Sequence, residues 1–95
     1  MKSQVQHNPF KREIQALVNG LSVSGITADY TGLKSLANAA RDVVQELIDS
    51  FRKDGVDGFI QALSAMIKGG KEHLRKLFSF PPNLRGSLPP ISIGR

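Results

Sequence analysis

Hydrophobic residues recur at three- and four-residue spacing along most of this chain, which is the pattern of amphipathic helices. Asn8 is a suitable N-cap residue, and Pro9 suits the first helical position, where an N–H would have no partner. Gly20 provides a C-terminal stop, so the pattern predicts a helix over about residues 9–19. Its apolar stripe consists of Phe10, Ile14, Leu17, Val18 and Leu21.

A second, longer apolar stripe predicts a central helix over about residues 29–53. Thr27 or Asp29 is expected to cap it. At about 1.5 Å per residue this helix is about 37 Å long, more than a small globule needs internally. Residues 22–26 before it are short and rich in small side chains, so we interpret them as a linker and expect no strands. The stripe contains Leu33, Leu36, Ala40, Val43, Val44, Leu47, Ile48 and Phe51.

A third helix is predicted after Asp57, which is expected to cap it. Two adjacent glycines, Gly69 and Gly70, interrupt its apolar pattern and cost about 2 kcal/mol of helix propensity relative to alanine. The segment is therefore either one kinked helix to about residue 79 or two short helices. With Gly55 as the corner, the second and third helices are predicted to form an antiparallel hairpin. The apolar face contains Phe59, Ile60, Leu63, Met66, Ile67, Leu74, Leu77 and Phe78.

The length of 95 residues allows one domain at most. Residues 1–8 are expected to form a flexible N-terminus and residues 9–80 a single helical domain. Two proline pairs and the absence of periodicity predict that residues 81–95 are an extended, disordered tail. The predicted fold is all-α, with three helices of which the long central one pairs with the third.

Charge is distributed unevenly along this chain of formal net charge +5. Residues 1–67 contain seven basic and seven acidic side chains, whereas residues 68–95 contain six basic side chains and Glu72 as the single acid. A neutral body with a basic end suggests an anionic partner, although the excess charge can also serve solubility alone.

Catalytic and metal chemistry find little support in the sequence. There is no cysteine, and His7 and His73 lie far apart on polar segments, so we expect no catalytic residue, no metal site and no cofactor. No run approaches the about 20 apolar residues that span a bilayer. The N-terminus also lacks the apolar centre of a signal peptide, so we expect a cytoplasmic protein.

The strongest candidate for binding is a basic cluster near the end of the third apolar segment. Lys68, Lys71 and Arg75 fall at spacings of three and four, on one face of a helix, and Lys76 and Arg85 follow them. Such a basic amphipathic helix can contact nucleic-acid phosphates, lie on an anionic membrane or dock on a protein. Alternatively, its apolar residues close the protein's own core and its lysines are ordinary surface.

We favour contact with the phosphate backbone of a duplex nucleic acid, RNA somewhat more than DNA, by a homodimer. Double-stranded RNA is recognised mainly by shape and backbone contacts, without a sequence-reading motif. The alternatives are a helical adaptor that binds an acidic protein surface, and reversible attachment of residues 66–80 to an anionic membrane. Further bases along the rod are expected to join the cluster on the duplex, namely Lys34, Arg41, Arg52 and Lys53.

In the order and length of its predicted elements, residues 10–80 resemble the dimeric silencing-suppressor proteins of insect nodaviruses, with three helices, a long central one and a proline-containing tail. The resemblance implies a dimer that binds double-stranded RNA. No motif carries it, so it transfers no functional residue to this chain.

Overall fold

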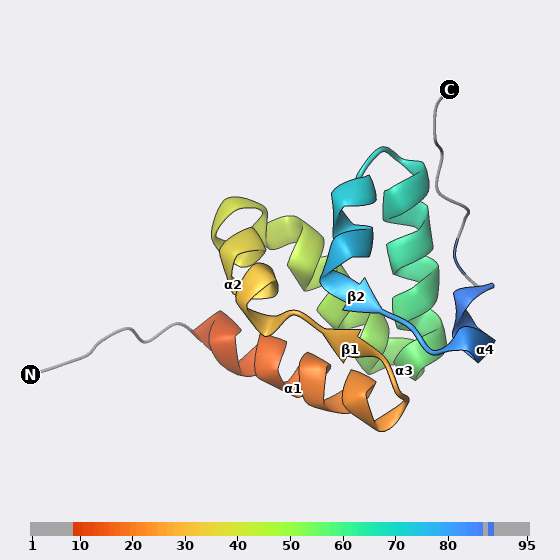
Figure 1. Ribbon diagram of the computed structural model, residues 1–95. Coiled ribbons are helices and arrows are strands. Elements are labelled where there is room, and N and C mark those ends of the chain that lie inside the picture. The colour runs from red at the N-terminus through yellow and green to blue at the C-terminus, as the bar shows by residue number, and fades with distance from the viewer. Residues whose placement is uncertain (1–8, 87, 89–95) are drawn as a thin grey trace, which may run out of the picture.

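The computed structural model describes residues 9–86 and 88, and this part of the chain is mostly helical with one small two-stranded sheet. The expectation of a helical fold is therefore confirmed, and Figure 1 shows the arrangement. In chain order the elements are α1 (Pro9–Val23), β1 (Thr27–Ala28), α2 (Tyr30–Ala39), α3 (Arg41–Lys68), the 3-10 helix η1 (Glu72–Leu77), β2 (Phe78–Ser79) and α4 (Pro82–Arg85).

The first helix, α1, runs four residues further than predicted, because Gly20 lies inside it and does not end it. A side chain at Gly20 would collide with the ring of Phe51, so this glycine permits close packing of α1 against α3. The predicted stripe is buried as expected at Phe10, Ile14 and Leu17, among others. α1 therefore supplies one wall of the core.

The predicted central helix is broken, which is the largest departure from the sequence prediction. α2 ends at Ala39, Ala40 has the non-helical angles φ −140° and ψ 63°, and α3 begins at Arg41. In proteins the packing of an apolar face stabilises a helix more than intrinsic propensity does. A straight helix of about 37 Å would carry one end past the core, whereas the break keeps both Leu33 of α2 and Val44 of α3 buried.

A second change of direction lies inside α3, where the sequence places it. Asp54 and Gly55 are non-helical, and Gly55 has a φ of 67°, a conformation that glycine adopts without strain. α3 then continues to Lys68 and stops at Gly69, and Gly70 reverses the chain with a φ of 106°. The two glycines therefore end the helix, and the next element is the separate 3-10 helix η1.

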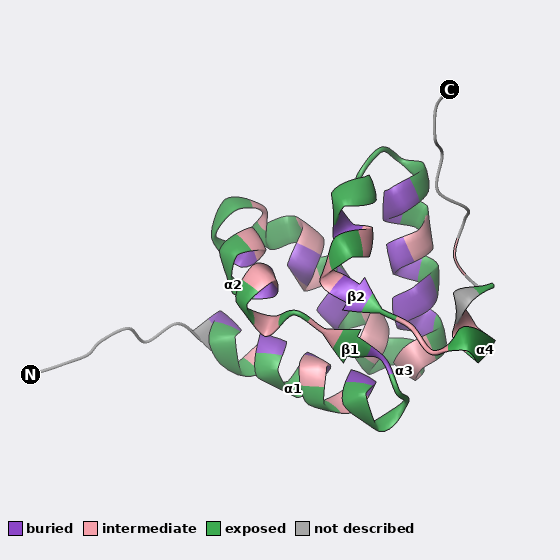
Figure 2. Cartoon of the chain, in the orientation of Figure 1, coloured by how far each residue is buried: buried purple, intermediate pink, exposed green. Residues whose placement is uncertain are grey.

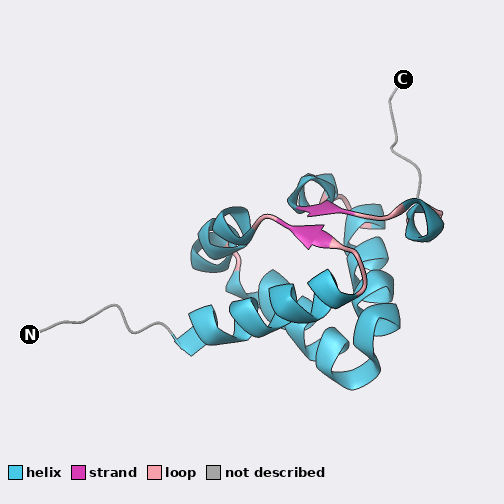
Figure 3. Ribbon diagram, turned by 60° about the horizontal axis from the view of Figure 1, so that its bottom comes forward, coloured by secondary structure: helices cyan, strands magenta, loops and turns pink. Residues whose placement is uncertain are grey.

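A two-stranded antiparallel sheet joins segments far apart in the sequence, contrary to the expectation of no strands. The two strands are drawn in magenta in Figure 3. Thr27 of β1 lies opposite Ser79 of β2, and Ala28 lies opposite Phe78. The N–H of Asp29 also donates to the carbonyl of Leu77 at 2.8 Å. This pairing ties the linker after α1 to the segment after η1, and two-residue strands are too short for an alternating pattern to reveal.

The core lies between the inner faces of α1, α2 and α3 and is closed by η1 and β2 (Figure 2). Among the described residues no polar or charged residue is buried. The rings of Phe59 and Phe78 meet edge to face, with centroids 4.9 Å apart and planes at 74°. The largest fully buried side chains are Phe59, Ile14, Leu17, Leu21, Ile26, Leu33, Leu47, Ile48, Leu63, Leu74 and Val44.

The predicted disordered tail is partly ordered. Residues 82–85 form the short helix α4, with Pro82 in its first turn, where proline is favoured. Leu84 and Leu88 are half-buried against the core, and this apolar contact explains why the segment folds back. Residues 87 and 89–95 of the predicted tail, and the predicted flexible N-terminus 1–8, lie outside the described residues.

Asp29 caps α2, as expected, because its carboxylate accepts a hydrogen bond of 3.0 Å from the N–H of Gly32. Replacing Asp29 by alanine leaves this N–H without its partner and is expected to lower the free energy of unfolding by about 1 kcal/mol. Chemical denaturation measures the change. Asp29→Asn keeps an acceptor and should retain most of the stability; equal losses in both variants would contradict the capping role.

Candidate binding surfaces

Lys68 ends α3, Lys71 precedes η1, and Arg75 and Lys76 lie in the last turn of η1; we call these four residues the basic end. Lys68, Lys71 and Arg75 do not share one helical face, contrary to the sequence prediction, because the turn at Gly69 and Gly70 separates α3 from η1. η1 instead folds back beside the end of α3 (Figure 1). Of the two possibilities that the sequence left open, a kinked helix or two short ones, the structure therefore has two separate helices that pack against each other.

Three of these four side chains are available to a partner. Lys68, Lys71 and Lys76 are exposed, whereas Arg75 is half-buried. Lys68 ends α3, and Arg75 and Lys76 lie in the last turn of η1, where cations are favourable because the C-terminal end of a helix carries partial negative charge. The positions of Lys68, Arg75 and Lys76 therefore also stabilise the helices, but the exposed lysines keep their ammonium groups at the surface.

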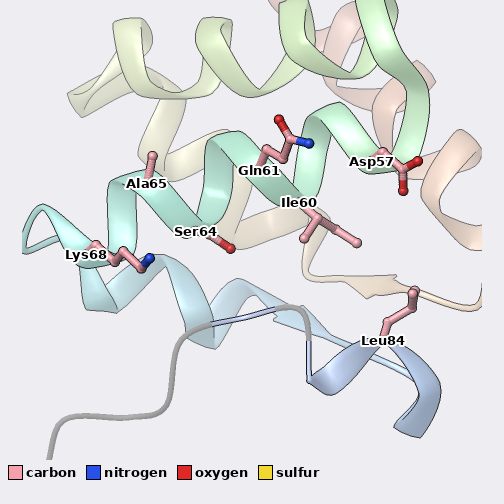
Figure 4. Close-up of a pocket in the computed structure, with 7 residues that line it drawn as sticks. All are labelled: Asp57, Ile60, Gln61, Ser64, Ala65, Lys68 and Leu84. Carbon is pink, nitrogen blue, oxygen red and sulfur yellow. The ribbon is translucent and has the colours of Figure 1, made fainter.

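A surface groove of about 560 Å³ begins beside Lys68 and runs between α3 and α4. Figure 4 shows Ile60, Ser64 and Lys68 on the side of α3 that faces α4, and Leu84 approaches from α4. The sequence prediction missed this groove, because it expected residues 81–95 to be disordered and so supplied no second wall. Its lining residues are Asp57, Ile60, Gln61, Ser64, Ala65, Lys68 and Leu84.

The first half of α3 carries an acidic face that lies close to two of the lysines predicted to bind nucleic acid. Asp42, Glu46 and Asp49 line a shallow hollow together with Lys53. Asp42 and Glu46 also border a second hollow, of about 430 Å³, that includes Lys71 and the end of α3. Lys53 therefore lies among carboxylates, which is unfavourable for contact with a phosphate backbone.

The other predicted bases are dispersed. The ammonium group of Lys34 lies 5.6 Å from the centre of the Tyr30 ring on α2. Arg41 and Arg52 share a cavity between α1 and α3, where the guanidinium carbon of Arg41 lies 5.5 Å from the centre of the Phe10 ring and Arg52 forms an ion pair with Glu13. The side chain of Arg85 lies outside the described part of the structure.

The described residues contain no group of three or more His, Asp or Glu side chains arranged to hold a metal ion. Nor does any helix in this part of the chain have the length and apolar character needed to cross a membrane. His73 is exposed at the start of η1. His7 lies outside the described residues.

Comparisons of the chain with protein-family models, with curated proteins and with solved structures find no match. The resemblance to nodavirus silencing suppressors depended on a long central helix, and that helix is interrupted at Ala40. A functional assignment therefore depends on the geometry of the surfaces alone.

Proposed function

We propose that this protein is a non-enzymatic binding protein that contacts the phosphate backbone of a duplex nucleic acid through its basic end. The supporting observation is that Lys68 at the end of α3, Lys71 at the start of η1 and Lys76 in its last turn are all exposed, and that Glu72 is the one acid from residue 68 onward. Compact clusters of lysine bind phosphates by releasing counterions and need no sequence-reading motif.

The contact is smaller than the sequence suggested. Arg41 and Arg52 line a separate cavity between α1 and α3, and Lys53 lies on the acidic face. We therefore assign the duplex contact to the three exposed lysines of the basic end, with Arg75 behind them. RNA remains favoured over DNA in this proposal because a shape-based backbone contact suits double-stranded RNA.

The proposal includes a cytoplasmic homodimer whose protomers fold the two halves of α3 into an antiparallel hairpin. In support of the hairpin, one hollow is lined by Asp42 and Glu46 from the start of α3 and by Ala65 and Met66 from near its end. A dimer presents two basic ends and doubles the number of lysines that a duplex can meet. Sedimentation of the full chain tests the association.

Binding by three lysines predicts a defined salt dependence. For double-stranded DNA the logarithm of the association constant should fall with the logarithm of salt concentration with a slope of about −2.7 for one protomer, or about −5.4 for a dimer. Gel shifts with double-stranded RNA, double-stranded DNA and single strands, over a salt series, measure the slope and the preference. A complete absence of shift at low salt would overturn the proposal.

Neutralising the lysines of the basic end tests whether the duplex contacts this surface or is attracted only by the net charge of the protein. The triple variant Lys68→Gln, Lys71→Gln and Lys76→Gln is expected to lose about tenfold or more in duplex affinity at low salt. The matched control replaces Lys11, Lys34 and Lys53, which are exposed elsewhere, by glutamine and so removes the same charge. Circular dichroism verifies that both fold. Equal losses in the two variants would show that no single end carries the contact.

The groove beside Lys68 favours a second candidate function, that of a protein adaptor. Ile60, Ala65 and Leu84 give it apolar walls, and Lys68 at its edge suits a peptide with an acidic residue. Attachment to a membrane is less favoured, because the residues that would insert include Leu74 and Phe78, and both are buried in the core. Co-sedimentation with anionic vesicles distinguishes that alternative.

A further inference from the structure

The cavity between α1 and α3 brings together two arginines and one carboxylate. It has a volume of about 270 Å³. Arg41, Gln45 and Arg52 come from α3 at spacings of four and seven residues, which place them on one face of that helix. Phe10 and Glu13 come from α1, one turn apart. The cavity is therefore an open site between two helices, with more positive than negative charge.

Arg41 is oriented toward this cavity without having an acidic partner. Its guanidinium carbon lies over the ring of Phe10, 5.5 Å from the ring centre, in a cation–π contact. Within the described part of the chain no carboxylate lies within ion-pair distance of Arg41. Arg41 is also the first residue of α3, where the partial positive charge of the helix terminus adds to its own.

Arg52 approaches the same cavity from the other end. It lies eleven residues after Arg41, about 16 Å along the helix axis, and both arginines line the cavity. Arg52 pairs with Glu13, but 57% of the arginine side chain is exposed. An ion pair in such an exposed place is weak. Glu13 can therefore yield this guanidinium to a stronger anionic ligand.

We propose that this cavity binds a phosphoryl group, with Arg41 and Arg52 donating to its oxygens and Glu13 displaced. Guanidinium groups match phosphate oxygens in geometry and hold them by paired hydrogen bonds. Glu13 then competes with the phosphoryl group for Arg52. This site is distinct from the basic end and does not rest on the proposed duplex binding.

Replacing Glu13 by glutamine provides the sharpest test, because a binding site and a purely structural ion pair respond differently. Removing the competing charge is expected to tighten the binding of inorganic phosphate about fivefold. Removing one of the two cationic donors, in Arg41→Gln, is expected to abolish it, while Arg41→Lys keeps the charge and recovers part of it. NMR titration of the full chain with sodium phosphate, at constant ionic strength, measures all three affinities.

Arg12→Gln is the matched control, because Arg12 is exposed on α1 and does not line the cavity. It should leave phosphate binding unchanged, and so should the triple lysine variant of the basic end, which separates this proposal from the duplex proposal. If Glu13→Gln fails to tighten phosphate binding, or Arg41→Gln retains it, the two arginines only tie α1 to α3 and the proposal is wrong.

The source of the phosphoryl group is distinguished by two single strands that differ only at one end. If the site reads the end of a nucleic acid, a 5′-phosphorylated oligonucleotide should bind more tightly than its 5′-hydroxyl form, and Arg41→Gln should remove the difference. If the natural ligand is a small phosphorylated molecule, the two strands should bind alike while inorganic phosphate still binds. If neither inorganic phosphate nor either of the two strands binds, the proposed site is wrong.

Discussion

Phe59→Ala is expected to lower the free energy of unfolding by about 3–5 kcal/mol, which is the usual cost of truncating a buried aromatic residue to alanine. Phe59 is completely buried, and its ring packs edge to face against Phe78 of β2. Small domains have only about 5–15 kcal/mol of stability in total. The variant should therefore lie close to its unfolding threshold at ordinary temperatures.

Chemical denaturation and thermal melting measure the effect, and the melting temperature should fall by at least about 12 °C. Val23→Ala is the control, because Val23 is apolar but 88% exposed, and its loss should change stability little. Phe59→Leu retains most of the volume and should cost less than Phe59→Ala. A loss below about 1 kcal/mol in Phe59→Ala would contradict the packing of β2 on α3.

The apolar pattern predicted most of the core, because helical periodicity determines which face of each helix is buried, but it missed Ile26, which is fully buried in the segment interpreted as a linker. Ile14 and Leu17 of α1 and Leu63 of α3 are buried as their spacing indicates. The corner at Gly55 was also predictable, since glycine adopts a positive φ where other residues are strained. The buried helix faces and the corner at Gly55 depend on local residue properties, so they can be predicted from the sequence.

The break at Ala40 was not predictable from local chemistry. Alanine has the highest helix propensity, and neither glycine nor proline lies between Leu33 and Arg41. Here tertiary packing overrides propensity, because both halves of the predicted helix must bury their apolar faces in one small core. Where the helix breaks therefore depends on contacts between distant segments, and these cannot be predicted from hydrophobic periodicity.

The same limit applied to the candidate sites. Exposure of the lysines was predictable from their charge, but their grouping depended on whether Gly69 and Gly70 kink or end a helix. Because η1 is a 3-10 helix with about three residues per turn, side chains after the turn no longer follow the α-helical phase. The contacts of Arg41 with Phe10 and of Arg52 with Glu13 join α3 to α1, so no local pattern contained them.

Gly58→Ala is expected to destabilise the protein, although alanine is the better helix former. Gly58 is buried one turn after the corner of α3, and a Cβ there would collide with the carbonyl oxygen of Ser50 and lie 2.7 Å from the Cβ of Asp54. The gain in helix propensity is about 1 kcal/mol. Overpacking costs about 1–3 kcal/mol, and a backbone oxygen cannot move aside cheaply, so the clash should prevail.

The matched control for this substitution is Gly86→Ala. Nothing lies within 4 Å of a Cβ at Gly86, whose φ is −69°, so alanine should be neutral or stabilise slightly there. Thermal melting of both variants, with Gly58→Val as a larger probe of the same contact, measures the difference. The losses should increase from alanine to valine at position 58, because each added methyl group pushes the two halves of α3 further apart. A Gly58→Ala protein that melts above the wild type would mean that the corner at Gly55 is more open than the structure shows.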